Sequence, residues 1–300
     1  MAGESYAGIY IPYLAMEILN YNKHPSSYGK TIQLKGIMVG NACTDPDECY
    51  VPGNGMSMYQ YEFLYNHAYI HEEEYDHIRA ACALNYTTDI CKERRDQYDD
   101  KFEKMKTSIL NIYAPCYNNS QERRHRIRQS GRMNDIDEGS CDDSYGIQHW
   151  FNEPLIQADL HVRSMNFDEC SDDVAKKYMM HENASYWIYP HLLKEKLRVW
   201  VYSGDVDADV PTPGTLHWIQ KFKEEHGIPI LEPWREWWVK GLHLHEDQVG
   251  GMTWELRGLT FVSVKGAGHM VPKDKRKAAY VMFESFLDGK SLPEKDQLDE

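Results

Sequence analysis

Strand-like segments alternate with helical ones at both ends of the chain. Apolar side chains recur at helical spacing over residues 6–20, and a strand-like run follows at 32–39. Further along, a short apolar strand is twice followed by a loop and a helix. The predicted strands are 197–202 and 259–264, and the predicted helices are about 215–225 and 275–287. This alternation is typical of a parallel sheet in an α/β fold, where functional groups collect at the carboxyl ends of strands.

The stretch between these parts has a different character. Residues 43–195 are rich in Tyr, Asn, Asp, Glu and Arg, and they hold all seven cysteines. Helical patches are predicted at about 59–83 and 94–112, with a loop over 118–139. We interpret this stretch as a long insertion into the sheet.

Composition excludes two broad classes of protein. The 300 residues include 33 Lys and Arg against 47 Asp and Glu, a net charge of −14 that disfavours nucleic acid as a partner. The mean hydropathy of −0.67, without an apolar run near ~18 residues, argues against a membrane span. Residues 1–6 have neither a basic nor an apolar leader segment, so no signal peptide is expected.

Three residue types suited to nucleophilic catalysis lie where predicted strands end. Ser5 comes just before the first helix, Asp207 follows the strand at 197–202, and His269 follows the strand at 259–264. A serine hydroxyl needs a base to remove its proton, an imidazole can do so near neutrality, and a carboxylate fixes the imidazole tautomer. The order Ser, Asp, His is that of the α/β-hydrolase triad.

Each of these signals alone has an ordinary explanation. Ser5 could be a simple helix N-cap, the glycines beside His269 could mark a turn, and an Asp-rich loop is usually solvated. All three in the right order, each after a strand, favour the triad. The pattern by itself does not choose among Asp205, Asp207 and Asp209.

Several motifs together resemble the serine carboxypeptidase family. The nucleophile motif is Gly3-Glu4-Ser5-Tyr6-Ala7-Gly8, and in-order matches span nearly the whole chain, at 34–46, 66–70, 201–211, 248–251, 258–262 and 266–272. The resemblance implies Asp207 as the acid, the backbone N–H of Tyr6 as an oxyanion donor and Glu4 as a ligand of the substrate's terminal carboxylate. In that family this Glu is paired with another acidic side chain. Two close carboxyls share a proton, which raises one pKa and lets an acid donate to the substrate's carboxylate at acidic pH. Met270 is predicted to line the pocket for the leaving residue.

The resemblance also implies a fold. We expect residues 1–300 to form a single α/β-hydrolase domain, with a helical, disulfide-bearing insertion at about 45–195. Family members carry a longer N-terminal portion with the first strands of the sheet, so this chain is expected to lack those strands. On that expectation, the polypeptide alone would not be a competent enzyme. A second oxyanion donor would be missing, and loss of the early strands would expose apolar faces and an open sheet edge.

The implied function is a hydrolase, a serine-type carboxypeptidase that releases C-terminal amino acids from peptides at acidic pH without a cofactor. The alternatives are acyl transfer by the same triad, or an inactive glycoprotein module. The implied location is the lysosome, the vacuole or the cell exterior. Peptides are the expected partners, neither nucleic acid nor a membrane is expected, and a homodimer is left open.

Cysteines and glycosylation motifs support a secretory history for the insertion. The resemblance pairs Cys82 with Cys91 and Cys116 with Cys141, and it leaves Cys170 without a partner. Cys43 and Cys49 are close enough in sequence to close a short loop. Asn-x-Ser/Thr motifs at Asn85, Asn118 and Asn183 predict N-glycosylation.

Two further clusters are given ordinary interpretations. The basic run at 123–128 is interpreted as a solvated loop, with a processing site as the alternative. The His243-Leu244-His245-Glu246-Asp247 cluster resembles metal ligands, but we interpret it as a solvent loop and expect no metal site.

Overall fold

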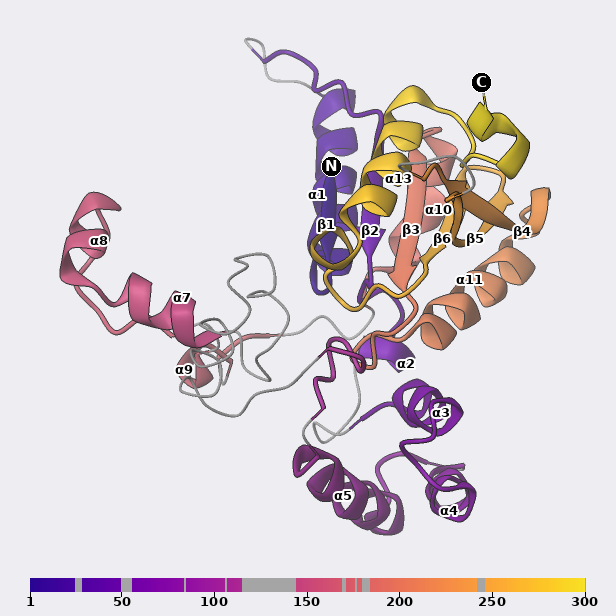
Figure 1. Ribbon diagram of the computed structural model, residues 1–300. Coiled ribbons are helices and arrows are strands. Elements are labelled where there is room, and N and C mark those ends of the chain that lie inside the picture. The colour runs from indigo at the N-terminus through magenta and orange to yellow at the C-terminus, as the bar shows by residue number, and fades with distance from the viewer. Residues whose placement is uncertain are drawn as a thin grey trace. The chain divides into compact units, whose positions relative to one another are not determined.

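The computed structural model describes residues 1–24, 29–49, 56–83, 85–105, 107–114, 144–168, 171–175, 177–179, 184–241 and 246–299 (Figure 1). The strands are β1 (Ala2–Glu4), β2 (Gly36–Gly40), β3 (Arg198–Gly204), β4 (Ile230–Val239), β5 (Gln248–Leu256) and β6 (Leu259–Val264). The helices are α1 (Ala7–Lys23), α2 (Pro46–Cys49), α3 (Met58–Asn66), α4 (Glu72–Cys82), α5 (Asp89–Glu103), α7 (Ser144–Phe151), α8 (Pro154–Asp159), α9 (Asp172–Ala175), α10 (Tyr189–Lys194), α11 (Thr212–His226), α12 (Val271–Asp274) and α13 (Arg276–Asp288), with the 3-10 turns η2 (Tyr186–Ile188) and η3 (Lys295–Asp299).

One sheet organises the described strands, in the order β1-β2-β3-β6-β5-β4. The four strands β1, β2, β3 and β6 run parallel. Strand β5 pairs antiparallel with β6, and β4 pairs antiparallel with β5. The carboxyl ends of β1, β2, β3 and β6 therefore lie along one edge of the sheet, where the segments holding Ser5, Asp207 and His269 leave it.

Both faces of the sheet are buried, because helices pack against each of them. Alternate strand residues point to opposite sides and so join two different cores. On β3, Val199 and Val201 join a core with α1, α10 and α11, whereas Trp200 and Tyr202 join a second core with α13. The α11 side is filled by the fully buried Trp218 and its neighbours. Two packed faces fix the strand register, since a slip of one residue would exchange the two cores.

The chain divides into two compact units. The first comprises residues 1–102, 109–112 and 182–300, and it contains the sheet. The second comprises residues 103–108 and 113–181, with α7 and α8 joined by side-chain bonds. In that unit, Gln157 donates to the carbonyls of Phe151 and Met165 and so holds the loop after α8. The single domain with an insertion at 45–195 remains a prediction.

Most predicted elements of the sheet are present, with three differences. The helix predicted at 94–112 is α5, which begins earlier and ends at Glu103. Gly3–Ser5, expected to form a turn that leads into the first helix, overlaps the short strand β1 (Ala2–Glu4). The strands β4 and β5 were not predicted, because Pro233 and the register shifts of β4 interrupt its alternation and Gly250-Gly251 do so in β5. Among the helices that the structure describes, none has the length and apolar character needed to cross a bilayer.

Candidate active site

Ser5 occupies a strained turn between β1 and α1. Its φ of 61° lies in the left-handed region, which is costly for a residue with a side chain and is found at functional turns. Backbone hydrogen bonds to β2 and to the segment after it hold the turn in place. Ser5 N donates to Gly40 O at 2.9 Å, and Cys43 N donates to Ser5 O at 3.1 Å. A Cβ at Gly8 would lie 2.3 Å from the carbonyl oxygen of Cys43, so this close approach requires glycine.

The acid and the base form a buried pair. His269 Nδ1 lies 2.7 Å from Asp207 Oδ2, and the two residues are 5% and 0% exposed. Burial opposes a charge on His269, but the hydrogen bond and charge of Asp207, aided by Asp209 and Glu4, outweigh it and raise its pKa. The His269 imidazole therefore holds a proton more readily than a free histidine does.

Asp207 is held in place by donors from two directions. The backbone N–H groups of Asp209 and Val210 donate to its carboxylate at 2.8 and 3.3 Å. The side chain of Asn41 donates to Oδ2 at 2.8 Å, the same oxygen that faces His269. The other two aspartates of the loop differ in their surroundings: Asp205 accepts from Gly266 N, and Asp209 Oδ2 lies 3.9 Å from His269 Nε2.

Glu4 connects β1 to the segment that follows His269. Its Oε1 accepts from the backbone N–H of Val271 at 3.1 Å, two residues beyond His269. Burial raises the pKa of the Glu4 carboxyl, while hydrogen bonding by Tyr202, the charge of His269 and the Val271 N–H act against that rise. A carboxyl with a raised pKa can be a donor in mildly acidic solution.

The comparisons with known proteins agree with this geometry. The family model described as "Serine carboxypeptidase" matches residues 1–289. The chain belongs to the serine carboxypeptidase family. Serine carboxypeptidase-like 25 of Arabidopsis thaliana is 33% identical over 98% of this chain and 62% of its own length, and serine carboxypeptidase 24 of the same plant is 32% identical with the same coverage. The chain thus spans about three fifths of the length of these relatives.

A solved structure shows the same fold. It is that of Kex1Δp, a prohormone-processing carboxypeptidase from Saccharomyces cerevisiae, at a TM-score of 0.64 and 22% identity over 96% of this chain and 61% of that one. The expected family and the expected fold class are therefore confirmed. The roles assigned to single residues of this family member remain predictions.

Tyr6 and Met270, predicted as an oxyanion donor and a pocket residue, directly follow Ser5 and His269 in the chain. Tyr6 is the N-cap of α1, so its amide lies at the positive end of the helix dipole, the end suited to an oxyanion. Met270 follows His269 directly and is 45% exposed, so its side chain is accessible to a ligand.

Sequence reasoning missed three residues at the site. Asn41 hydrogen-bonds to Asp207, and Tyr202 hydrogen-bonds to Glu4. Asn41 lies just after the strand predicted at 32–39 and Tyr202 ends the strand predicted at 197–202, and these positions could have indicated a role at the site. The third is Glu48, a buried carboxyl that accepts from Thr215 Oγ1 at 3.0 Å and whose pKa burial raises to about 8. Its long-range partners could not be read from local sequence.

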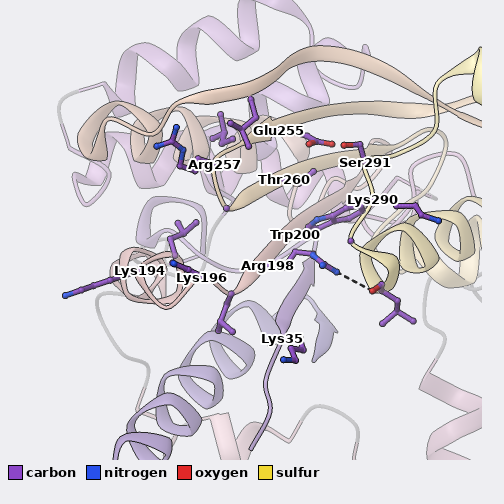
Figure 2. A pocket seen from close by; sticks show the side chains of 17 residues that line it. Lys35, Lys194, Lys196, Arg198, Trp200, Glu255, Arg257, Thr260, Lys290 and Ser291 are labelled. Atoms are coloured by element: carbon purple, nitrogen blue, oxygen red, sulfur yellow. Dashed lines mark hydrogen bonds between the residues drawn. The ribbon is translucent and has the colours of Figure 1, made fainter.

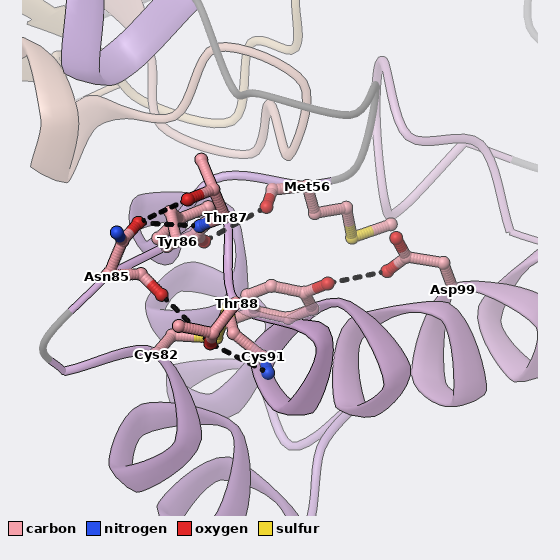
Figure 3. The surroundings of a disulfide bond; sticks show 9 residues. Met56, Cys82, Asn85, Tyr86, Thr87, Thr88, Cys91 and Asp99 are labelled. Carbon is pink, nitrogen blue, oxygen red and sulfur yellow. Dashed lines mark hydrogen bonds between the residues drawn. A yellow bond between two sulfur atoms is a disulfide. The ribbon is translucent and has the colours of Figure 1, made fainter.

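The disulfide at Cys82–Cys91 joins the end of α4 to α5 (Figure 3). Cys43 is also disulfide-bonded, and the side chain of its predicted partner Cys49 lies outside the described residues, as do Cys116, Cys141 and Cys170. Of the glycosylation candidates, Asn85 is exposed and its amide oxygen accepts from the backbone and the hydroxyl of Thr87. Asn118, Asn183, the basic run at 123–128 and residues 242–245 lie outside the described residues.

Proposed function

We propose that this chain provides the catalytic centre of a carboxypeptidase, with Ser5, His269 and Asp207 as its triad. The observation that carries the proposal is the buried 2.7 Å contact between His269 Nδ1 and Asp207, at the same sheet edge as the strained Ser5. Two hydrogen bonds support that common location. The Glu4 side chain accepts from Val271 N, in the segment after His269, and the carbonyl of Gly40, next to Asn41, accepts from Ser5 N.

The proposed reaction begins with the Ser5 hydroxyl. His269 removes its proton while Oγ attacks the last peptide carbonyl, and Asp207 stabilises the imidazolium. The Tyr6 N–H donates to the developing oxyanion. When the C–N bond breaks, His269 returns the proton to the departing amino acid and leaves an acyl group on Ser5. Water, deprotonated by His269, then hydrolyses the ester and restores the hydroxyl.

Glu4 supplies the preference for a free C-terminus in this proposal. A protonated Glu4 carboxyl donates to the substrate's terminal carboxylate, and the raised pKa keeps that proton available in mildly acidic solution. The Tyr202 hydroxyl hydrogen-bonds to the Glu4 carboxyl and orients it. Burial and Glu4 keep that hydroxyl protonated by raising the pKa of Tyr202. Met270 is proposed to contact the leaving side chain, because it is exposed beside the base.

Two measurements test the proposal. A fluorophosphonate probe should label folded residues 1–300 at Ser5, and the label should be absent in Ser5→Ala. A blocked dipeptide with a free C-terminus should release its last residue slowly, and His269→Ala should abolish this release. Labelling that survives Ser5→Ala would refute the assignment of the nucleophile. Transfer of the acyl group to an added alcohol in place of water would indicate acyl transfer.

We further propose that the protein is glycosylated at Asn85 and resides in the lysosome, the vacuole or the cell exterior. The Cys82–Cys91 bond supports an oxidising compartment, and the exposed Asn85 side chain lies in an Asn-x-Thr motif. Glycosidase-sensitive mass at Asn85 in protein purified from its source tests the first point. A homodimer is also proposed, and sedimentation velocity over a range of concentrations tests it.

A further inference from the structure

A cavity lies at the opposite end of the sheet from Ser5 and His269. It has a volume of about 820 Å³ and opens where β3 begins and where β5 turns into β6 (Figure 2). Arg198, the first residue of β3, and Gly258, in the turn between β5 and β6, both line it. Its size is within the range of small-molecule sites, about 300–1,000 Å³. The proposed peptidase reaction uses none of its residues.

Positive charge is concentrated in this cavity. One lining residue, Glu255, is acidic, whereas six are basic, although the whole chain carries a net charge of −14. The local balance is therefore opposite in sign to that of the protein. The basic lining residues are Lys35, Lys194, Lys196, Arg198, Arg257 and Lys290.

Helix ends explain part of this charge. Arg198 donates to the carbonyls of Phe286 and Leu287 at the end of α13, and Lys290 pairs with Asp288 at 2.9 Å. Lys194 is the last residue of α10, where a cation is favoured by the helix dipole. These three basic groups have structural roles.

The other three basic side chains have no such explanation. Within the described part of the chain, the side chains of Lys35, Lys196 and Arg257 make no hydrogen bond or ion pair. All three are exposed. Lys196 also has a φ of 59°, a left-handed conformation that Gly or Asn would adopt at lower cost. Lysine thus occupies a position where local backbone energetics favour Gly or Asn.

The floor of the cavity is rigid and partly apolar. Trp200, Leu197 and Leu256 line it from buried positions, and Trp200 packs edge-on against Phe286 of α13. The acidic group, Glu255, is half-buried and accepts a hydrogen bond from Ser291. A ligand would thus meet a packed, partly apolar floor surrounded by long, flexible cationic side chains.

We propose that this cavity binds a small organic polyanion, a compact molecule that carries several phosphate, sulfate or carboxylate groups. A single inorganic ion is too small to reach basic groups on both sides of a cavity of this volume. A multivalent anion would contact Lys196 and Arg257 from one side and Lys35 from the other, and it would relieve the mutual repulsion of the six cations. The proposal is independent of the proposed peptidase activity.

Isothermal titration of residues 1–300 tests the proposal. Inositol hexakisphosphate and sucrose octasulfate are the phosphate and sulfate probes, and myo-inositol is the neutral control. We expect one molecule of at least one polyanion to bind per chain, and no heat from myo-inositol. Affinity should fall when salt is raised, because the cations are exposed and screened. Absence of binding by both polyanions, or binding that salt does not weaken, would overturn the proposal.

Charge reversal locates the site. The double variant Lys196→Glu/Arg257→Glu should weaken binding by about 100-fold, because each reversal replaces an attraction with a repulsion of similar size. Arg163→Glu/Lys177→Glu is the matched control, since both residues are exposed, lie outside the cavity and change the net charge equally. The control should stay within about twofold of wild type. If it lost as much affinity as the cavity variant, the binding would reflect net charge alone and the site would be wrong.

Discussion

Replacement of Asn41 by alanine tests how the acid of the triad is held. Asn41 is fully buried, and its side chain makes two strong contacts: Nδ2 donates to Asp207 Oδ2 at 2.8 Å and Oδ1 accepts from Gly204 N at 3.0 Å. A hydrogen bond to a charged group contributes about 1.5–3 kcal/mol, and a neutral one about 0.5–1.5 kcal/mol. The variant should therefore lose about 2–4 kcal/mol of unfolding free energy.

The backbone adds to this loss. Asn41 has a φ of 38°, and Asn tolerates the left-handed region better than Ala does, so about 1 kcal/mol more is expected. The total of about 3–5 kcal/mol can be measured as a shift of the urea midpoint at unchanged slope.

A matched control is available at Asn22. Its side chain also makes one donor and one acceptor bond, both to Ile32 at 2.8 Å, but it is only partly buried. Water can replace those bonds, so Asn22→Ala should cost less than about 1 kcal/mol. Equal losses in the two variants would refute the argument that burial of the Asp207 contact determines the cost.

Three more perturbations have defined outcomes. Tyr202→Phe removes the hydroxyl that lowers the pKa of Glu4, so that pKa should rise further; carboxyl NMR titration measures it, and an unchanged or lower value would contradict the contact. Cys82→Ser with Cys91→Ser opens a loop with a sequence separation of 9, which should cost about 2–3 kcal/mol in urea unfolding. The pKa of Glu48 is raised from 4.5 to about 8 in the folded state, so between these pH values the folded protein holds a proton that the unfolded chain has released. The contribution of this proton to the free energy of unfolding is full below pH 4.5 and is lost as the pH rises toward 8. Glu48→Gln should flatten this fall, and a pH profile of unfolding that matches wild type would contradict it.

Local sequence was sufficient for three of the four parallel strands, β2, β3 and β6. The strand predicted at 259–264 coincides with β6, and those at 32–39 and 197–202 overlap β2 and β3, because buried strands are continuous apolar runs bounded by glycine or polar turns. The same rule failed for β4, whose Pro233 and exposed polar positions are tolerated because it is an edge strand. Edge strands carry weaker patterns since one side lacks a neighbour.

The candidate site divides in the same way. Ser5, Asp207 and His269 could be proposed from motifs and strand ends, because each lies within a few residues of a recognisable turn. Their supports could not. Asn41 meets Asp207 across 166 residues of sequence, and Tyr202 reaches Glu4 only because Gly40 lacks the Cβ that would lie 2.0 Å from its ring. Such contacts depend on which strands become neighbours, and local periodicity does not contain that information.

The parallel pairing of β2 with β3 has a consequence for the timing of synthesis. Strand β2 cannot pair with β3 until the segment that begins at Arg198 has left the ribosome, because Gly36 lies opposite Arg198. The pairing of β3 with β6 comes later still. Ser5 and His269 are separated by 269 − 5 = 264 residues, which at about 5–20 residues per second takes roughly 13–53 s to translate. The proposed nucleophile thus emerges long before its base. A nascent chain would remain without a complete proposed triad until residue 269 had been made, so the topology itself would delay peptidase activity during synthesis.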